Sequence, residues 1–344
     1  MKIIRPILLV ALLLGGCGRA PQPDTLRIFN WSDYIGSKTI ETFRTNNAAK
    51  VIYDNYSSNE DLIAKLDSGG AQYDLVFPSS YAVEILRAKG LLRTIDHAAL
   101  PNLTNLMTEF AHPSFDQELQ VCVPYTWSTT GIGYDSTVIS DDEAKSLAIL
   151  FDPRFKGKIL MLDDMRASLG MALKALGYSA NSTNATEVAA ARDKLLAQKE
   201  LVHVYASMNI PQLLGSGEVK LAYGWSGDIL RAATVNKNIR FMVPKEGTLV
   251  YVDYMCIPTN APNPALAHKF INHVLDPAVA ADIAETIKYA IPNTRAKDLV
   301  SPDTKLLWDQ LQTANDPSKL EQVHNLGSAL DLYDKAWQAV KAAK

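Results

Sequence analysis

The sequence is poor in cysteine: its 344 residues include only Cys17, Cys122 and Cys256. So few cysteines exclude a disulfide framework of the kind that holds small secreted domains together. Cys122 and Cys256 stand in similar surroundings, Val-Cys-Val-Pro and Met-Cys-Ile-Pro. From the residues alone we expect two buried thiols, and a single bridge between them is the alternative.

The sequence also lacks the patterns that bind metal ions and nucleotides. Its six histidines are scattered, and His268 and His273 are five residues apart, which puts them on different faces of a helix. It contains no His-x-x-x-His or Cys-x-x-Cys pair and no glycine-rich phosphate loop. The acidic pairs at 141–142 and 163–164 lack the pattern of a calcium loop. We therefore expect neither a metal ion nor a cofactor.

Charge and catalytic motifs exclude two further classes of protein. The 34 Lys and Arg and 37 Asp and Glu residues give a formal net charge of −3, without the basic excess that nucleic-acid binding requires. The segment GWSGD at 224–228 resembles the nucleophile elbow of hydrolases, but Asp228 stands where the elbow needs glycine. The sequence places no histidine beside it. We expect a protein that is not an enzyme.

The apolar run at 7–14 is too short for a membrane-spanning helix of about 20 residues. It follows Lys2 and Arg5, as in a secretory signal. The segment LGGC at 14–17 is similar to the bacterial lipobox, in which cleavage leaves Cys17 as a lipidated N-terminus; a soluble export signal with an incidental cysteine is the alternative. Residues 17–24 would then form a tether. We expect a periplasmic protein anchored by lipid alone, or a cell-surface one if the source has a single membrane.

From residue 24 onward, strand-like and helix-like segments alternate. Strands are predicted at 26–30, 50–53, 73–77, 157–162, 219–223, 239–243 and 249–257. Helices are predicted at 37–45, 59–68, 81–89, 168–176, 186–198, 228–236, 264–275, 277–289, 303–312 and 331–341. This alternation predicts an α/β fold with mainly parallel sheets, and the length is sufficient for two lobes with a cleft between them.

The segment Asn30-Trp31-Ser32-Asp33-Tyr34 stands where the first predicted strand ends. Ligands of open α/β sheets bind beyond the carboxyl ends of strands, where the helices begin. A Trp, a carboxylate and a Tyr at that position combine aromatic faces with negative charge, and organic cations are held by this combination. The alternative is a simple turn, in which Ser32 or Asp33 caps the helix and the aromatic rings pack in the core.

An aromatic ring or a carboxylate recurs at other predicted strand ends. These residues are Tyr81, Asp164, Trp225 with Asp228, and Tyr251 with Asp253. Tyr81 comes directly after Pro78-Ser79-Ser80. Each alone has a structural explanation, as a helix cap or as core packing. Together, at one topological position, they favour a site for an organic amine. A buried ammonium is costly unless carboxylates pair with it, and aromatic walls suit the methylene chain between two ammoniums.

At these residues the chain resembles the spermidine/putrescine-binding proteins of bacterial polyamine ABC importers. The matching segments are IFNWSDY at 28–34, SNE at 58–60, YDLVFPS at 73–79, LDD at 162–164, GWSGD at 224–228, PKEG at 244–247, ETIKY at 285–289 and PN at 292–293. The resemblance implies a two-lobe periplasmic binding protein fold of type II, with parallel-rich sheets, flanking helices and crossing strands at a hinge. Lobe one would contain 24–125 and 256–298, and lobe two 126–255 and 299–344. Cys122 and Cys256 would lie near the crossing strands, where a hinge disulfide becomes testable.

The function implied by the resemblance is binding of a polyamine, putrescine or spermidine, and its delivery to an ABC permease in the inner membrane. The chain would act as a monomer without covalent catalysis. Two alternatives stay open: a polyamine sensor that hands its signal to a membrane receptor, and a binder of a different organic amine.

Carried over position by position, the resemblance also implies the ligand-binding residues. Trp31 and Tyr251 would be walls beside the methylene chain, and Asp253 and Tyr289 would hold an inner amine. The other implied residues are Ser32, Asp33, Tyr34, Ser79 and Tyr81 from lobe one and Asp164, Trp225 and Asp228 from lobe two, with Trp127 lining the cleft.

The chain departs from the family pattern at three positions. Ala167 stands where the family commonly has a glutamate for a terminal amine, and Val323 where some spermidine binders have a glutamine. Tyr251 replaces the usual Trp. The lost carboxylate reduces the negative charge available to a polyamine, and Asp228 offsets part of that loss.

Overall fold

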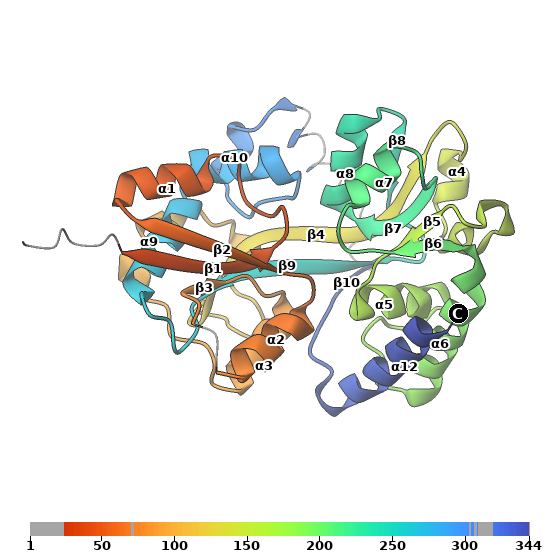
Figure 1. Ribbon diagram of the computed structural model, residues 1–344, viewed down its shortest axis with the longest axis horizontal. Helices are drawn as coiled ribbons and strands as arrows, with labels where there is room; N and C mark the ends of the chain where they lie inside the picture. The colour runs from red at the N-terminus through yellow and green to blue at the C-terminus, as the bar shows by residue number, and fades with distance from the viewer. Residues whose placement is uncertain (1–23, 70–71, 303, 306–307, 309–318, 344) are drawn as a thin grey trace, which may run out of the picture.

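The computed structural model describes residues 24–69, 72–302, 304–305, 308 and 319–343. The predicted signal segment, Cys17 and most of the predicted helix at 303–312 therefore lie outside the described residues. Within the described residues, ten strands form one curled sheet with helices packed around it (Figure 1). The strand order is β2-β1-β3-β9-β4-β7-β5-β6, with β10 beside β9 and β8 beside β4.

The first strands and helices confirm the predicted βαβ units. Strands β2 (Lys50–Tyr56) and β3 (Leu75–Val76) both run parallel to β1 (Thr25–Trp31). They alternate with the helices α1 (Thr39–Asn47), α2 (Asn59–Asp67) and α3 (Ser80–Ala88). The Ser58 hydroxyl accepts a hydrogen bond from the backbone N–H of Asp61 and so caps the start of α2.

Two long antiparallel strands, β4 (Cys122–Asp135) and β9 (Thr248–Cys256), connect the two ends of the sheet (Figure 1). Near its start β4 pairs with β9, and near its end it pairs with β7 and β8. Strand β9 is predicted from the sequence, whereas β4 is not. All fourteen residues of β4 are buried, so the strand lacks the alternation of apolar and polar residues that marks a half-buried strand.

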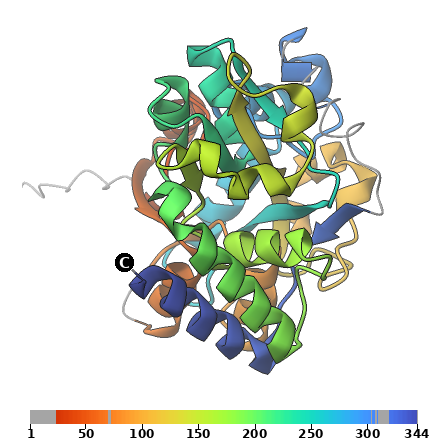
Figure 2. The ribbon, with the colours of Figure 1, turned by 90° about the vertical axis from the view of Figure 1, so that its right-hand side faces the viewer.

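The second half of the sheet contains β5 (Ile159–Met161), β6 (Val202–Tyr205), β7 (Leu221–Trp225) and β8 (Ile239–Met242). Its helices are α4 (Asp141–Ala144), α5 (Met165–Ala175), α6 (Ala185–Gln198), α7 (Ile210–Gly215), α8 (Ser226–Val235) and α12 (Leu330–Ala342). Helix α12 returns from the C-terminal end of the chain to pack beside α6 (Figure 2). Strand β6 and helix α7 are absent from the sequence-based prediction.

The remaining elements complete the packing around the sheet. They are α9 (Pro264–Val274), α10 (Pro277–Ile287), β10 (Leu320–Gln322) and the 3-10 helices His97–Ala99, Pro101–Asn105, Thr108–Phe110, Leu147–Phe151, Pro153–Phe155, Lys199–Leu201, Ala296–Asp298 and Gly327–Ala329. Among the described residues, none of the helices is both long enough and apolar enough to cross a membrane.

Buried apolar side chains gather in two clusters, one at each end of β4 and β9. The first core includes Phe43 from α1, Leu62 from α2 and Phe270 from α9. The second core includes Leu169 from α5 and Leu195 from α6. Two separate cores joined by two long strands leave room for a site between them.

Cys122 and Cys256 are joined by a disulfide in the structure. The two residues are directly opposite each other in the register of β4 and β9, with their Cα atoms 4.5 Å apart. Facing positions on neighbouring antiparallel strands bring two side chains to one face at bridging distance. The expectation of two free thiols is therefore wrong, because the residues alone do not reveal this register.

Candidate functional site

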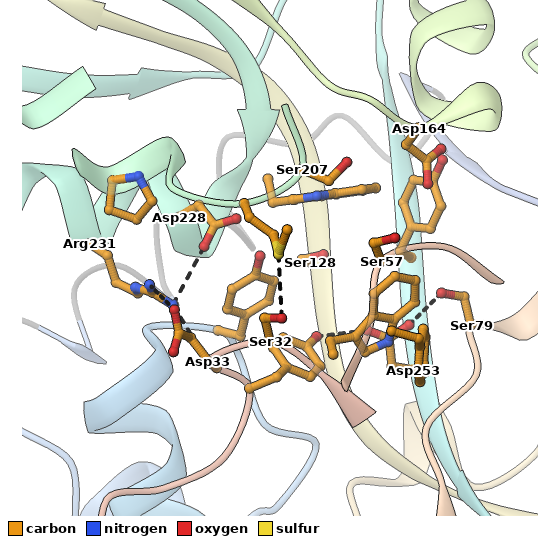
Figure 3. Close-up of a pocket in the computed structure, with 18 of the residues that line it drawn as sticks. Ser32, Asp33, Ser57, Ser79, Ser128, Asp164, Ser207, Asp228, Arg231 and Asp253 are labelled. Carbon is orange, nitrogen blue, oxygen red and sulfur yellow. Dashed lines mark hydrogen bonds and ion pairs between the residues drawn. The ribbon is translucent and has the colours of Figure 1, made fainter. Parts of the chain in front are cut away.

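A cavity lies between the two cores (Figure 3). Its lining residues lie at or just after the carboxyl ends of β1, β2, β3, β5, β6 and β7, on β4 and β9 between them, on α8, and at Tyr289 after α10. Eleven of the residues predicted to bind the ligand line it: Trp31, Ser32, Asp33, Tyr34, Ser79, Asp164, Trp225, Asp228, Tyr251, Asp253 and Tyr289. The structure thus brings together strand ends that are far apart in the sequence.

The segment after β1 supplies one wall of the cavity. The Trp31 indole N–H donates a hydrogen bond to the Phe77 carbonyl at 2.9 Å, and the Trp31 ring tilts against that of Tyr56. Helix α1 begins after Lys38 without a side-chain cap, so neither Ser32 nor Asp33 caps it. The helix cap in the alternative explanation is therefore wrong, whereas its packed rings are observed: Tyr34 belongs to the first core and Trp31 packs against it. The backbone of this segment adopts φ = 51° at Asp33, in the left-handed region that Asp tolerates better than most residues.

Asp253 is a buried carboxylate in the middle of β9, where it is 8% exposed. One of its oxygens accepts a hydrogen bond from the Ser79 hydroxyl at 2.6 Å, and the other accepts one from the Tyr34 hydroxyl at 2.7 Å. Burial raises the pKa of Asp253 to about 6, against the effect of these two hydrogen bonds. None of the described cationic side chains forms an ion pair with it, so the carboxylate is oriented but not neutralised.

Asp164 provides a second buried carboxylate, from the start of α5. Its Oδ1 accepts a hydrogen bond from the Ala167 backbone N–H at 2.7 Å, and burial raises its pKa. The ring of Tyr251 meets that of Trp225 edge-on, with centroids 4.7 Å apart, and the buried Tyr251 hydroxyl has no hydrogen-bond partner among the described residues. Two carboxylates and several aromatic rings therefore face the same cavity.

Asp228 and Asp33 both form ion pairs with Arg231. The Arg231 guanidinium lies 3.7 Å from Asp228 Oδ1 and 3.7 Å from Asp33 Oδ2. Burial raises the pKa of Asp228 to about 6, while the positive charge of Arg231 and a hydrogen bond with Tyr289 oppose that rise. In Figure 3, Arg231 lies with Asp33 and Asp228 on one side of the view, and Asp164 and Asp253 lie on the other.

The structure does not bring Tyr81 and Trp127 to the cavity. The Tyr81 hydroxyl donates a hydrogen bond to Glu60 at 3.0 Å, and its ring lies against the Arg166 guanidinium. Trp127 lines a separate hollow with Trp308, on the side of β4 opposite Ser128. Neighbouring residues of a strand point to opposite faces of the sheet, and it is Ser128 that lines the cavity.

Sequence reasoning missed several lining residues: Tyr56, Ser57, Asn59, Ser128, Ser207, Met208, Asn209, Pro211 and Arg231. Tyr56 is the last residue of β2, and Ser57 and Asn59 follow it, so the rule about strand ends would have found all three. Residues 207–211 follow β6, which was not predicted. No sequence signal points to Arg231, since its partner Asp33 is distant in the chain.

Two departures from the family pattern have a structural counterpart. Ala167 and Val323, the positions at which a glutamate and a glutamine were expected from the resemblance, are both fully buried. Glu60 places a further carboxyl group in this region: burial, and then the nearby charge of Asp164, raise its pKa to about 7. Among the described residues, no three His, Cys, Asp or Glu side chains are grouped to hold a metal ion.

Comparison with known proteins gives consistent matches over the length of the chain. Residues 38–313 match the family model of bacterial extracellular solute-binding proteins. The spermidine/putrescine-binding periplasmic protein of Salmonella typhimurium is 38% identical over 97% of both chains. A putrescine/cadaverine-binding protein of Pseudomonas aeruginosa is 30% identical, over 98% of this chain and 99% of the relative.

A solved structure supports the same assignment. The TpPotD lipoprotein of Treponema pallidum superimposes with a TM-score of 0.81 at 30% identity, over 92% of this chain and 99% of the other. This match confirms the predicted α/β periplasmic binding protein fold. Matches of this extent show that the chain belongs to the bacterial extracellular solute-binding proteins, a family of binding proteins and not of enzymes.

Proposed function

We propose that the chain binds a polyamine, putrescine or spermidine, in the cavity between its two cores and delivers it to an ABC permease. The observation that carries this proposal is Asp253. A buried carboxylate without a counter-ion is unfavourable, and Ser79 and Tyr34 hold this one in a fixed orientation inside the cavity. An ammonium group supplies the missing positive charge and donates hydrogen bonds to it.

The remaining lining residues fit the rest of such a ligand. Asp164 offers a second carboxylate, and the rings of Trp31, Trp225 and Tyr251 offer apolar faces for a methylene chain. Aromatic faces also attract ammonium groups, so they suit both parts of a polyamine. A neutral or anionic ligand would leave the carboxylates unpaired.

We infer that two lobes close around the ligand by a hinge in β4 and β9. Lobe one would comprise 24–125 and 256–298, and lobe two 126–255 and 299–344. The positions of the two cores support this division, since each is built mainly from one of these sets of residues. Small-angle X-ray scattering should then show a smaller radius of gyration with ligand than without it.

Calorimetry on the purified mature protein tests the binding proposal. The ligands are putrescine, spermidine, spermine, agmatine, lysine and arginine. We expect a micromolar or lower Kd for at least one polyamine and no measurable binding of the two amino acids, whose carboxylates meet the acidic cavity. Tight binding of an amino acid, or no binding of any polyamine, would overturn the proposal.

Delivery to a permease and the lipid anchor need experiments in cells. Polyamine uptake should be lost when the gene is deleted and restored by the wild-type chain but not by Asp253→Asn. Unimpaired uptake in the deletion strain would favour a sensor.

Replacement of Cys17 by serine should release the protein from the membrane fraction. We infer a monomer, which light scattering on the eluted protein can check.

A further inference from the structure

Arg231 pairs with Asp33 and Asp228, two of the residues predicted to bind the ligand. Its guanidinium contacts the side chains of both Asp33 and Asp228, and one of its N–H groups donates a hydrogen bond to the Asp33 carbonyl at 3.3 Å. Arg231 lies on α8 beside the second core, whereas Asp33 follows β1 beside the first. The guanidinium therefore reaches across the cavity and neutralises carboxylates on both sides of it.

An ordinary helical ion pair does not explain this geometry. Arg231 and Asp228 are three residues apart on α8, a spacing that forms surface pairs of little energetic value. However, the Arg231 side chain is only 20% exposed, lines the cavity and contacts the backbone of a segment 198 residues away. These contacts make it part of the wall of the site.

The charges that line the cavity are thereby divided into two sets. The lining carboxylates are Asp33, Asp164, Asp228 and Asp253, and Arg231 is the one cation among the described lining residues. Arg231 forms ion pairs with Asp33 and Asp228 at one end of the cavity. Asp164 and Asp253 have no ion pair with a described cation, so two carboxylates stay available for two ammonium groups.

We propose that Arg231 is a specificity-determining residue that makes the site select diamines over triamines, an inference that rests on the proposed function. A diamine places its ammonium groups at Asp164 and Asp253, with its methylene chain along the aromatic walls. The third ammonium of a triamine extends toward Asp33 and Asp228, where it meets the positive guanidinium instead of free carboxylates. Repulsion between like charges in a partly buried site disfavours that ligand.

Calorimetry with putrescine and spermidine tests this inference on the mature protein. We expect the wild type to prefer putrescine, and Arg231→Gln to shift the ratio of the two Kd values toward spermidine by at least about tenfold. Arg231→Met should produce the same shift, whereas Arg231→Lys keeps the positive charge and should keep the preference for putrescine. The matched control is Arg192→Gln, which removes an exposed arginine that pairs with its neighbour Asp193.

A second substitution locates the effect. In the Arg231→Gln background, Asp33→Asn should weaken spermidine binding more than putrescine binding, because the freed carboxylate is then the partner of the third ammonium. Thermal melts of each variant check that it is folded.

The outcomes separate this inference from the proposed function. A ratio in Arg231→Gln and Arg231→Met that stays within about twofold of the wild type overturns the inference, even if both affinities rise, because the guanidinium then merely competes with every amine. A wild-type protein that binds neither amine overturns both proposals.

Discussion

The Tyr34 hydroxyl donates a hydrogen bond to the Asp253 carboxylate at 2.7 Å, although 219 residues separate the two in the sequence. Tyr34 follows β1, and Asp253 lies on β9 between the two cores. Their contact joins the segment that first indicated an amine site to the carboxylate on which the proposed function rests. Because Ser79 holds the other carboxylate oxygen, Asp253 cannot turn away from the cavity.

Replacing Asp253 should cost more affinity than replacing any single aromatic wall. Asp253→Asn keeps the shape but leaves a buried ammonium without its counter-ion, which costs about 3 kcal/mol or more, about a hundredfold in Kd. Trp31→Leu removes an aromatic face worth about 0.5–2 kcal/mol. Calorimetry with the preferred polyamine measures both. Equal losses, or a harmless Asp253→Asn, would contradict this weighting.

Affinity should fall as the pH falls through 6. Burial raises the pKa of both Asp228 and Asp253 to about 6, so each is ionised at neutral pH and largely protonated one unit below its pKa. An aliphatic ammonium, like that of lysine with a pKa of about 10.4, stays charged throughout this range. We expect the Kd to rise at least about tenfold between about pH 7.5 and pH 5.

Neighbouring charges decide the shape of this pH profile. The charge of Asp164 raises the pKa of Asp253. The pKa of Asp228 is lowered by Arg231 and raised by Asp33. Glu60, with a pKa of about 7, titrates in the same range. Asp228→Asn should therefore flatten the profile without abolishing it. A Kd that is constant from neutral to mildly acidic pH would show that none of these groups must ionise for binding.

The unliganded protein should show the opposite trend in stability. The pKa of Asp228 and of Asp253 is raised in the folded state above the unfolded value of about 3.9. The folded state therefore binds more protons than the unfolded state between these values. This contribution to stability is fully present below about pH 4 and is lost as the pH rises through 6. In chemical denaturation, the free energy of unfolding should decline less with rising pH in Asp228→Asn than in the wild type. An identical decline would contradict the raised pKa of Asp228 in the folded state.

The parts of the fold and of the site that could be predicted are those whose residues lie close together in the sequence. The segment after β1 carries its aromatic rings and carboxylate within five residues, so the sequence was enough to predict that Asp33 and Tyr34 lie at a cavity, where the structure has them. Strand β4 was missed because it is buried throughout. Without that strand, the sequence could not show which face of the sheet Trp127 lies on, and it lines a separate hollow away from the cavity. The contact between Arg231 and Asp33 depends on tertiary packing alone, and no local pattern encodes it.

Removing the disulfide should destabilise the protein without changing its binding residues. Cys122 and Cys256 close a loop with a sequence separation of 134, and a bridge of that kind contributes about 2–4 kcal/mol by restricting the unfolded chain. The double replacement by serine should lower the free energy of unfolding in urea by that amount. Mass spectrometry of the alkylated, non-reduced protein should find both cysteines unmodified. Two alkylated thiols would contradict the bridge.

Gly227 permits a close contact across the cavity, and Gly227→Ala should disrupt it. A Cβ atom at this position on α8 would overlap the ring of Tyr289, which packs in the first core and interacts with Asp228. The ring has no flexible end that can move aside, so either it or α8 must shift. Forced overlap of this kind costs about 1–3 kcal/mol of stability, and we expect at least about a tenfold loss of polyamine affinity with it.

Gly224→Ala is the matched control for this substitution, because a Cβ atom there has no contact closer than 3.4 Å among the described residues. It should change the stability and the Kd much less than Gly227→Ala does. Tyr289→Leu in the Gly227→Ala background should recover part of the lost stability but not the affinity, since the tyrosine that faces Asp228 is then gone. If Gly227→Ala binds polyamine as the wild type does, the two halves of the site can separate at Tyr289 without loss, and the contact is not needed for binding.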